Sequence, residues 1–216
     1  VEALVRWEHP RRGLLAPRSF IPLAEQNGLI EPLGQWVIHH ACRQVAQWQK
    51  DVPGAAPLHL LLNVSSRQFA SGQLVRTVVD VIDDSGLDPR RLFLEITESV
   101  MIENTEAVLQ QLQQLRALHV RVSVDDFGIG YSSLSYLHRL PLDQLKLDRE
   151  FIAGLGVDPQ SRAIVEAVIR LAHTLELEVV AEGVEHEHQR DELVRMGCDC
   201  AQGFLFAPPA SPADIE

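Results

Sequence analysis

Six apolar runs in this chain end at a carboxylate, amide or ammonium group, and the first apolar run carries two further charged side chains. The polar residues at these places are Glu2 and Arg6 in the first run, then Asn63, Glu95, Asp125 with Asp126, Lys146, Glu182 and Gln202. Any one of them could be structural, because strands must stop somewhere and ion-pair networks also gather charges. As a set they predict one polar site.

Asp125 and Asp126 indicate what that site holds, because two adjacent carboxylates repel each other and a bound cation removes the repulsion. Together with Glu2, Asn63 and Glu95 they offer hard oxygen ligands, which suit Mg²⁺ or Mn²⁺ rather than zinc. A carboxylate pair can also bridge two metal ions, the arrangement used in phosphoester cleavage. Gly128 and Gly130 would let the next loop turn tightly. The residues therefore predict a two-metal site.

The elements that must position these side chains are strands that alternate with amphipathic helices. The predicted strands are Glu2–Trp7, Leu58–Val64, Leu92–Thr97, Val120–Asp125, Gln144–Leu147, Glu178–Glu182 and Cys198–Gly203. The predicted helices are Glu103–Leu118, with a cap at Asn104 or Thr105, Ser161–Glu176, and Glu187–Met196, which should end at Gly197. Asp51–Pro57 fits a loop from a helix to a strand. This alternation predicts an α/β protein with a parallel sheet covered by helices.

Two architectures are compatible with that pattern, an open doubly wound sheet and a closed eight-stranded barrel. No G-x-G-x-x-G follows an early strand, so a dinucleotide-binding fold has no support. In a barrel the carboxyl ends of the strands, and with them the polar residues, would meet at one mouth. The chain offers one strand fewer than a barrel needs, and it begins at Val1 inside an apolar run. We therefore expect a single domain over residues 1–216 that is a fragment of a longer protein.

Composition excludes some functions. The formal net charge of −11 argues against a general DNA- or RNA-binding protein, which would carry a basic face. No apolar stretch is long enough to span a bilayer. Cys42, Cys198 and Cys200 are expected to be small buried hydrophobic residues in a reducing compartment. His186 and His188 lack the further ligands of a metal site.

Several short motifs together resemble the EAL domains, bacterial phosphodiesterases that act on cyclic di-GMP. They are Glu2-Ala3-Leu4-Val5-Arg6-Trp7, Asn63-Val64-Ser65, Glu95-Ile96-Thr97-Glu98, Asp125-Asp126-Phe127-Gly128, Leu145-Lys146-Leu147-Asp148, Ala181-Glu182-Gly183-Val184-Glu185 and Gln202-Gly203-Phe204. The resemblance implies a (β/α)₈ TIM-like barrel with one antiparallel strand. It also implies hydrolysis of cyclic di-GMP to linear pGpG with Mg²⁺ or Mn²⁺, and Ca²⁺ is expected not to support turnover because it positions water poorly.

The resemblance also implies a role for each matching residue. Glu2, Asn63, Glu95 and Asp125 would hold one metal ion, and Asp126 would join Asp125 on a second. Lys146 would orient the attacking water, and Glu182 would be the general base or a water-mediated partner of a metal ion. Arg6 would contact a substrate phosphate and Gln202 would complete the site. Glu98 would brace the loop from Phe127 to Ser133, which in the family links the active site to dimerisation.

The sequence departs from the family pattern in two ways. Ile129 stands where the family usually has threonine, and a mild effect on loop packing or regulation is expected. The segment that usually precedes the first motif, with its barrel strand, is missing, and we expect the natural protein to supply it upstream.

Other readings remain open: a cyclic di-GMP receptor or regulatory module without turnover, and an unrelated metal-dependent barrel enzyme. By resemblance, we expect a homodimer fused upstream to a sensor or GGDEF domain. Because its substrate is intracellular, the domain should face the cytoplasm, even if the parent protein is anchored in a membrane.

Overall fold

The computed structural model describes residues 1–52, 57–98, 100, 105–127, 137 and 139–215. The chain forms two compact units. The first comprises Val1–Glu95, Glu106–Arg121 and Ser211–Glu216, and the second comprises Ile96–Thr105 and Val122–Ala210. The chain passes from one unit to the other within three elements, β5 (Leu92–Thr97), α6 (Thr105–Ala117) and β6 (Arg121–Phe127).

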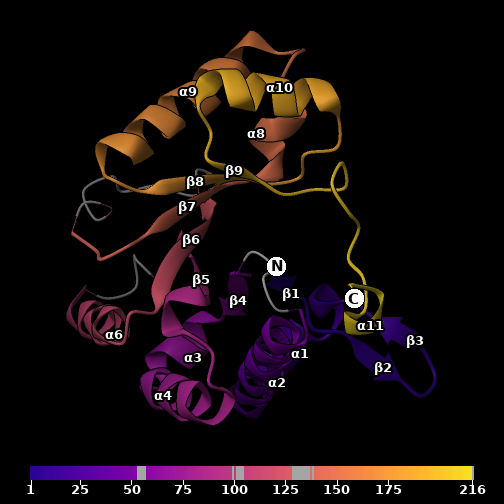
Figure 1. Cartoon of the computed structure of the whole chain (residues 1–216), viewed down its shortest axis with the longest axis vertical. Coiled ribbons are helices and arrows are strands. Elements are labelled where there is room, and N and C mark those ends of the chain that lie inside the picture. The colour runs from indigo at the N-terminus through magenta and orange to yellow at the C-terminus, as the bar shows by residue number, and fades with distance from the viewer. Residues whose placement is uncertain (53–56, 99, 101–104, 128–136, 138, 216) are drawn as a thin grey trace. The chain divides into compact units, whose positions relative to one another are not determined.

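In the first unit, β1 (Glu2–Ala3) pairs in parallel with β4 (Leu60–Val64), and Glu2 lies opposite Leu61. The strand β5 follows β4 in the order of the sheet. A separate antiparallel hairpin consists of β2 (Trp7–His9) and β3 (Gly13–Leu15) (Figure 1).

The longest helix of the first unit, α2 (Ile30–Asp51), buries Ile38, Cys42 and Val45, which are spaced by three and four residues and so share one face. This helix packs against α4 (Leu74–Ser85), whose C-cap residue Gly86 is left-handed, with φ of +69°. The helices of this unit, besides the part of α6 that belongs to it, are α1 (Ile21–Gln26), α2 (Ile30–Asp51), α3 (Ser66–Ala70), α4 (Leu74–Ser85) and α11 (Pro212–Ile215), with 3₁₀ turns at Pro17–Ser19 and Pro89–Arg91.

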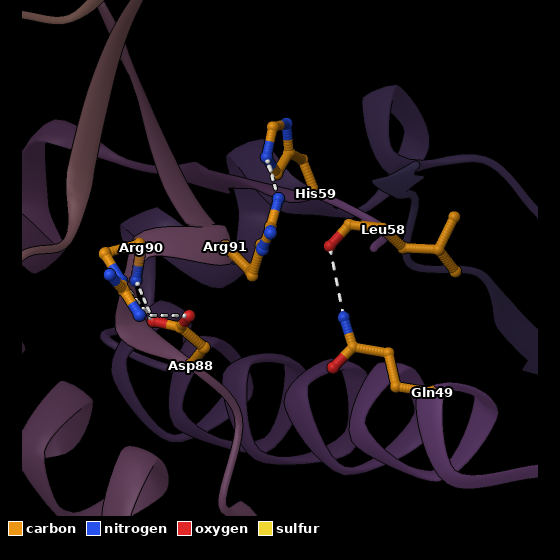
Figure 2. Close-up of polar contacts among 6 residues, drawn as sticks. All are labelled: Gln49, Leu58, His59, Asp88, Arg90 and Arg91. Carbon is orange, nitrogen blue, oxygen red and sulfur yellow. Dashed lines mark hydrogen bonds and ion pairs between the residues drawn. The ribbon is translucent and has the colours of Figure 1, made fainter. Parts of the chain in front are cut away.

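Side chains hold the two residues that precede β4 (Figure 2). The Nε2 group of Gln49 donates to the carbonyl oxygen of Leu58 at 3.4 Å, and the guanidinium group of Arg91 donates to Nε2 of His59 at 2.8 Å. Because arginine has no acceptor atom, Nε2 of His59 must be the acceptor and carries no proton. The strand itself starts at Leu60, two residues later than predicted.

In the second unit, β6, β7 (Gln144–Leu147), β8 (Glu178–Ala181) and β9 (Cys200–Ala201) lie side by side in that order, and each neighbouring pair is parallel. Every residue of β7 is buried. The helices α8 (Arg149–Ala153), α9 (Pro159–Thr174) and α10 (Glu187–Met196) lie on one face of β7, β8 and β9 (Figure 1).

Local signals account for the ends of these helices. The Asp158 carboxylate caps the start of α9, because it accepts the backbone N–H groups of Gln160 at 3.1 Å and Ser161 at 2.9 Å. The helix α10 stops at its C-terminal end because Gly197, which follows it, is left-handed, with φ of +79°. The predicted bounds of α10 are therefore confirmed, whereas α9 begins and ends two residues earlier than predicted.

The first predicted strand, Glu2–Trp7, is wrong, because β1 contains only Glu2 and Ala3 and Trp7 already begins the β2–β3 hairpin. The other predicted strands are present, with shifted ends in several cases. The strand β6 runs from Arg121 to Phe127, β8 ends at Ala181, and β9 contains only Cys200 and Ala201. The helix predicted from Glu103 is described from Thr105 onward as α6, and Asn104 lies outside the described residues.

The cysteines are only partly as predicted. Cys42 is buried, Cys198 is half-buried and Cys200 is exposed, so the prediction of burial is wrong for Cys200. The short β9 explains this, because Cys198 precedes the strand and Cys200 lies in a strand that pairs with β8 over only two residues. None of the helices in the described part of the chain is both long and apolar enough to cross a membrane.

Candidate active site

Asp125 and Asp126 lie in an irregularity of β6. The pairing with β7 shifts here, so that these two residues stand opposite one residue of β7, Lys146. Such a bulge bends a strand and re-aims its side chains. Asp126 has φ of +55°, and its N–H group donates to Oδ1 of Asp125 at 2.9 Å. The bulge therefore places two carboxylates together opposite one lysine.

Lys146 is almost fully buried and contacts two carboxylates. Its side chain is 1% exposed, and its Nζ atom lies 2.5 Å from Oε1 of Glu182 and 3.7 Å from Oδ1 of Asp125. Removing an ammonium group from water is costly unless opposite charges and hydrogen bonds replace the lost hydration. The backbone brings Glu182 to this place, because its N–H group donates to the carbonyl oxygen of Leu147 at 3.0 Å and so extends the contact of β8 with β7.

Excess negative charge gathers at the bulge. The pKa of Asp126 is raised, mainly by partial burial and then by repulsion from Asp125 and Asp148. The positive charge of Lys146 lowers it in part. Asp148 was not predicted to belong to the site, although it lies two residues after Lys146 and alternate residues of an extended segment share a face. The repulsion between these carboxylates is an interaction that a nearby positive charge would relieve.

Gln202 is held next to the end of β8 by its own backbone. Its N–H group donates to the carbonyl oxygen of Ala181 at 2.8 Å, and its carbonyl oxygen accepts the N–H group of Val184 at 3.0 Å. In the second unit the structure therefore brings together Asp125, Asp126, Lys146 and Glu182, with Gln202 beside the segment that carries Glu182.

Glu98, also in the second unit, is 6% exposed, and neither of its carboxylate oxygens has a hydrogen-bond partner among the described residues. Its predicted contact is the loop Phe127–Ser133, of which only Phe127 lies within the described residues. The loop residues Gly128, Ile129 and Gly130 also lie outside them. The proposed bracing role of Glu98 therefore stays a prediction.

In the first unit the structure brings together Glu2, Asn63 and Glu95. The Nδ2 group of Asn63 donates to Oε1 of Glu2 at 2.7 Å, which leaves the amide oxygen of Asn63 as the atom suited to a metal ion. Glu95 is 1% exposed. Burial lowers the pKa of the Val1 amino group, and the negative charges of Glu2 and Glu95 partly offset that effect. Two carboxylates and an amide are thus close neighbours at β1, β4 and β5.

Arg6, which also belongs to the first unit, is exposed beyond the end of β1. Its guanidinium group donates to the carbonyl oxygens of Leu4 at 3.3 Å and Val5 at 3.0 Å. The residue also lines an apolar cavity of about 560 Å³, to which Trp7, Phe20 and Trp36 contribute aromatic rings. Because the other donors of the guanidinium group remain available, Arg6 could bind an anion without losing its backbone contacts.

The donor atoms fit Mg²⁺ or Mn²⁺, because they are carboxylate and amide oxygens and because Asp126 already bears the repulsion of neighbouring carboxylates. Across the described residues, no three His, Cys, Asp or Glu side chains gather as a ready metal site. The predicted ligands divide between the two units, with Glu2, Asn63 and Glu95 in the first and Asp125 and Asp126 in the second. The two-metal site therefore stays a prediction.

Comparison with known proteins identifies the family. The family model described as "EAL domain" matches residues 1–209 of this chain. This chain belongs to the EAL domain family. MucR of Pseudomonas aeruginosa, named a bifunctional diguanylate cyclase/cyclic di-GMP phosphodiesterase, is 48% identical over 209 residues, which are 97% of this chain and 30% of MucR. PdeR of Escherichia coli, named a cyclic di-GMP phosphodiesterase, is 43% identical over 216 residues, covering 100% of this chain and 32% of PdeR.

Solved EAL domains confirm the predicted fold class, a (β/α)₈ TIM-like barrel fragment. The PaMucR phosphodiesterase in complex with c-di-GMP superposes with a TM-score of 0.94 and 47% identity, over 100% of this chain and 87% of that chain. The EAL enzyme Bd1971 with bound cAMP and cyclic di-GMP gives a TM-score of 0.92 and 34% identity, over 99% and 58% of the two chains. This EAL chain spans about a third of the length of the curated relatives that it matches.

Proposed function

We propose that this EAL domain is a phosphodiesterase that hydrolyses cyclic di-GMP to linear pGpG with Mg²⁺ or Mn²⁺. The observation that carries the proposal is the bulge of β6, which sets Asp125 and Asp126 opposite Lys146, whose ammonium group contacts Glu182. The relatives MucR and PdeR are named for activity on cyclic di-GMP, and the PaMucR phosphodiesterase was solved with c-di-GMP.

The metal ions would be held by Glu2, Asn63, Glu95 and Asp125, with Asp126 sharing the second ion with Asp125. When bound, such ions would neutralise the charge of the phosphodiester and lower the pKa of a bound water. The neutralisation matters here because the chain has a net charge of −11 and would otherwise repel an anionic substrate.

The remaining residues of the site would bind and orient the reactants. Lys146 carries a fixed ammonium group whose position is set by Glu182, so it can orient a water molecule through a hydrogen bond. Glu182, which is 21% exposed in its side chain, can accept a proton from that water or contact a metal ion through water. Arg6 offers a planar fork of donors to a substrate phosphate, and Gln202 would complete the site.

The deciding experiment is incubation with cyclic di-GMP and Mg²⁺, Mn²⁺ or Ca²⁺, each supplied separately, with the nucleotides separated by ion-exchange chromatography and binding measured by calorimetry. We expect pGpG with Mg²⁺ or Mn²⁺ and little or none with Ca²⁺, whose larger coordination sphere positions water poorly. Tight binding without product under both Mg²⁺ and Mn²⁺ would instead make the domain a receptor.

Two ligand variants test the metal assignment. Glu2→Ala and Asp125→Ala should each abolish turnover, because each removes a carboxylate proposed to bind a metal ion. Both should leave the far-ultraviolet circular dichroism spectrum unchanged, because neither residue belongs to the apolar core. The matched control is Glu166→Ala, which removes a carboxylate that pairs with Arg170 one turn along α9 and should keep full activity. Turnover that survives in either ligand variant contradicts the assignment.

The proposal extends to the setting of the domain. We propose that it works as a homodimer within a longer protein that also carries a sensor or GGDEF domain, and that it faces the cytoplasm. Sedimentation analysis of the domain tests the dimer, and a monomer at all concentrations would contradict it.

A further inference from the structure

Gly183 follows Glu182 directly and lies against the first residue of α8. Its φ is +68°, in the left-handed region that favours glycine. A Cβ atom added at Gly183 would lie 2.4 Å from Cβ of Arg149 and 3.3 Å from its Cα atom, whereas carbon atoms in contact normally stay about 3.5–4.0 Å apart. Both the backbone conformation and the close neighbour therefore require glycine at this position.

The contact joins the two turns that carry the reactive pair. One turn follows β7, which carries Lys146 and ends at Leu147, and the other follows β8, which ends at Ala181 directly before Glu182. The N–H group of Glu182 donates to the carbonyl oxygen of Leu147 at 3.0 Å, and on the far side of Gly183 the N–H group of Val184 donates to the carbonyl oxygen of Gln202 at 3.0 Å. Gly183 thus lies between the residue that contacts Lys146 and the residue that anchors Gln202.

We propose that Gly183 is a positioning residue, whose close contact with Arg149 holds the Glu182 carboxylate against Lys146. A side chain at position 183 must move the two turns apart by about 1 Å to restore normal carbon contacts. That displacement falls directly on Glu182, the adjacent residue, and a misplacement of about 1 Å at reacting groups can cost about a hundredfold in rate. The effect on rate rests on the proposed phosphodiesterase function, whereas the effect on the Lys146–Glu182 distance does not.

The first test compares Gly183→Ala with Gly197→Ala. Gly197 also has a positive φ, of +79°, but an added Cβ there would meet no atom within 4 Å. Both variants should lose stability because alanine is strained at such φ values. Only Gly183→Ala should lower kcat, by about tenfold to a hundredfold, with little change in KM for cyclic di-GMP. A kcat for Gly183→Ala equal to that of Gly197→Ala would overturn the proposal.

The second test is rescue. Arg149→Gly removes the Cβ atom that the new methyl group would strike, whereas Arg149→Ala keeps it. In the Arg149→Gly background, Gly183→Ala should therefore cost less than about threefold in kcat, and in the Arg149→Ala background it should keep its full effect. If Gly183→Ala alone does not fold, restored folding and turnover in the Arg149→Gly background support the proposal. Failure of that double variant to fold, or equal losses in both backgrounds, refutes it.

Crystal structures separate this inference from the proposed function. In Gly183→Ala the Nζ–Oε1 distance between Lys146 and Glu182 should lengthen from 2.5 Å to beyond hydrogen-bond range. An unchanged Nζ–Oε1 distance would contradict the positioning role of Gly183, even if the wild-type domain hydrolyses cyclic di-GMP. Conversely, a wild-type domain that yields no product with Mg²⁺ or Mn²⁺ ends the proposed function, while a lengthened distance in the variant still supports the role of Gly183.

Discussion

Replacing Gly34 by alanine should destabilise the domain, although alanine is the better helix former. Gly34 lies inside α2, and a Cβ atom added there would lie 1.8 Å from Nε2 and 2.6 Å from Cδ of Gln68. Gln68 is 8% exposed, and its Oε1 atom accepts the N–H group of Ser65 at 3.2 Å, while Oγ of Ser65 accepts the N–H group of Gln68 at 3.3 Å. The methyl group must therefore displace a side chain that closes the capping box of α3.

The magnitude follows from opposing effects. Alanine gains about 1 kcal/mol over glycine in a helix interior. Displacing Gln68 loses one hydrogen bond of about 1 kcal/mol and leaves a buried amide and the Ser65 N–H group without their partners, at a further cost of about 1–3 kcal/mol. The net expectation is a loss of about 1–3 kcal/mol in the free energy of unfolding. In a Gln68→Ala background the collision is gone, so the same Gly34→Ala change should stabilise by about 0.5–1 kcal/mol.

Urea unfolding of the four chains that carry neither, either or both substitutions measures this double-mutant cycle. The predicted result is a change of sign: Gly34→Ala lowers the free energy of unfolding when Gln68 is present and raises it when Gln68 is absent. The reasoning fails if Gly34→Ala stabilises the unaltered domain, or if it destabilises both backgrounds equally. The site is affected too, because Ser65 begins the cap only two residues after Asn63, a predicted metal ligand.

Further predictions concern charged groups of the second unit. If Lys146 orients the attacking water as proposed, Lys146→Met should reduce turnover below about 1% of wild type. It should also lower the free energy of unfolding by about 2 kcal/mol, at the low end for a buried pair because both carboxylates are partly exposed. Steady-state kinetics and urea unfolding measure the two effects, and wild-type turnover in the variant contradicts the proposed role.

Asp199 is partly buried, which opposes its ionisation, but its hydrogen bonds with His173 and the Val179 N–H group outweigh burial and lower its pKa. The stability that its charge contributes should be complete above the ordinary aspartate pKa of about 3.9 and disappear as the pH falls through the lowered value. Asp199→Asn should therefore cost about 1 kcal/mol at pH 6, and the cost should shrink as the pH is lowered below the ordinary aspartate pKa. A cost that does not shrink as the pH falls would contradict this.

Most strands and the helix signals could be read from the sequence because they depend on neighbouring residues. The run Gln144–Leu147 is apolar enough to be a buried strand, and β7 has those bounds. Gly197 ends α10 as predicted, because a left-handed residue after a helix is a local requirement that glycine meets. The polar residues at the strand ends were found for the same reason, and the pairs Glu2–Asn63 and Lys146–Glu182 are in contact.

Errors arose where pairing between strands decides the outcome. The sequence suggested one strand from Glu2 to Trp7, but β1 keeps only the two residues that pair with β4, and Trp7 pairs with Leu15 in a hairpin. The sequence did not reveal that Asp148 raises the pKa of Asp126, because this repulsion depends on the distance between β6 and the residue that follows β7.

The order of strands β4 to β9, the helices α6, α9 and α10, and the membership of the chain in the EAL domain family could be read from the sequence alone, because these depend on periodicity and motif order along the chain. The β2–β3 hairpin and the helices α1 to α4 were not predicted. Only the tertiary structure decided that Asp125 and Asp126 share a bulge opposite Lys146, that Gln68 fills the space beside Gly34, and that Gly183 abuts Arg149. The physical reason is that strand register and close packing are set by contacts between residues distant in sequence, and a shift of one residue changes every such contact.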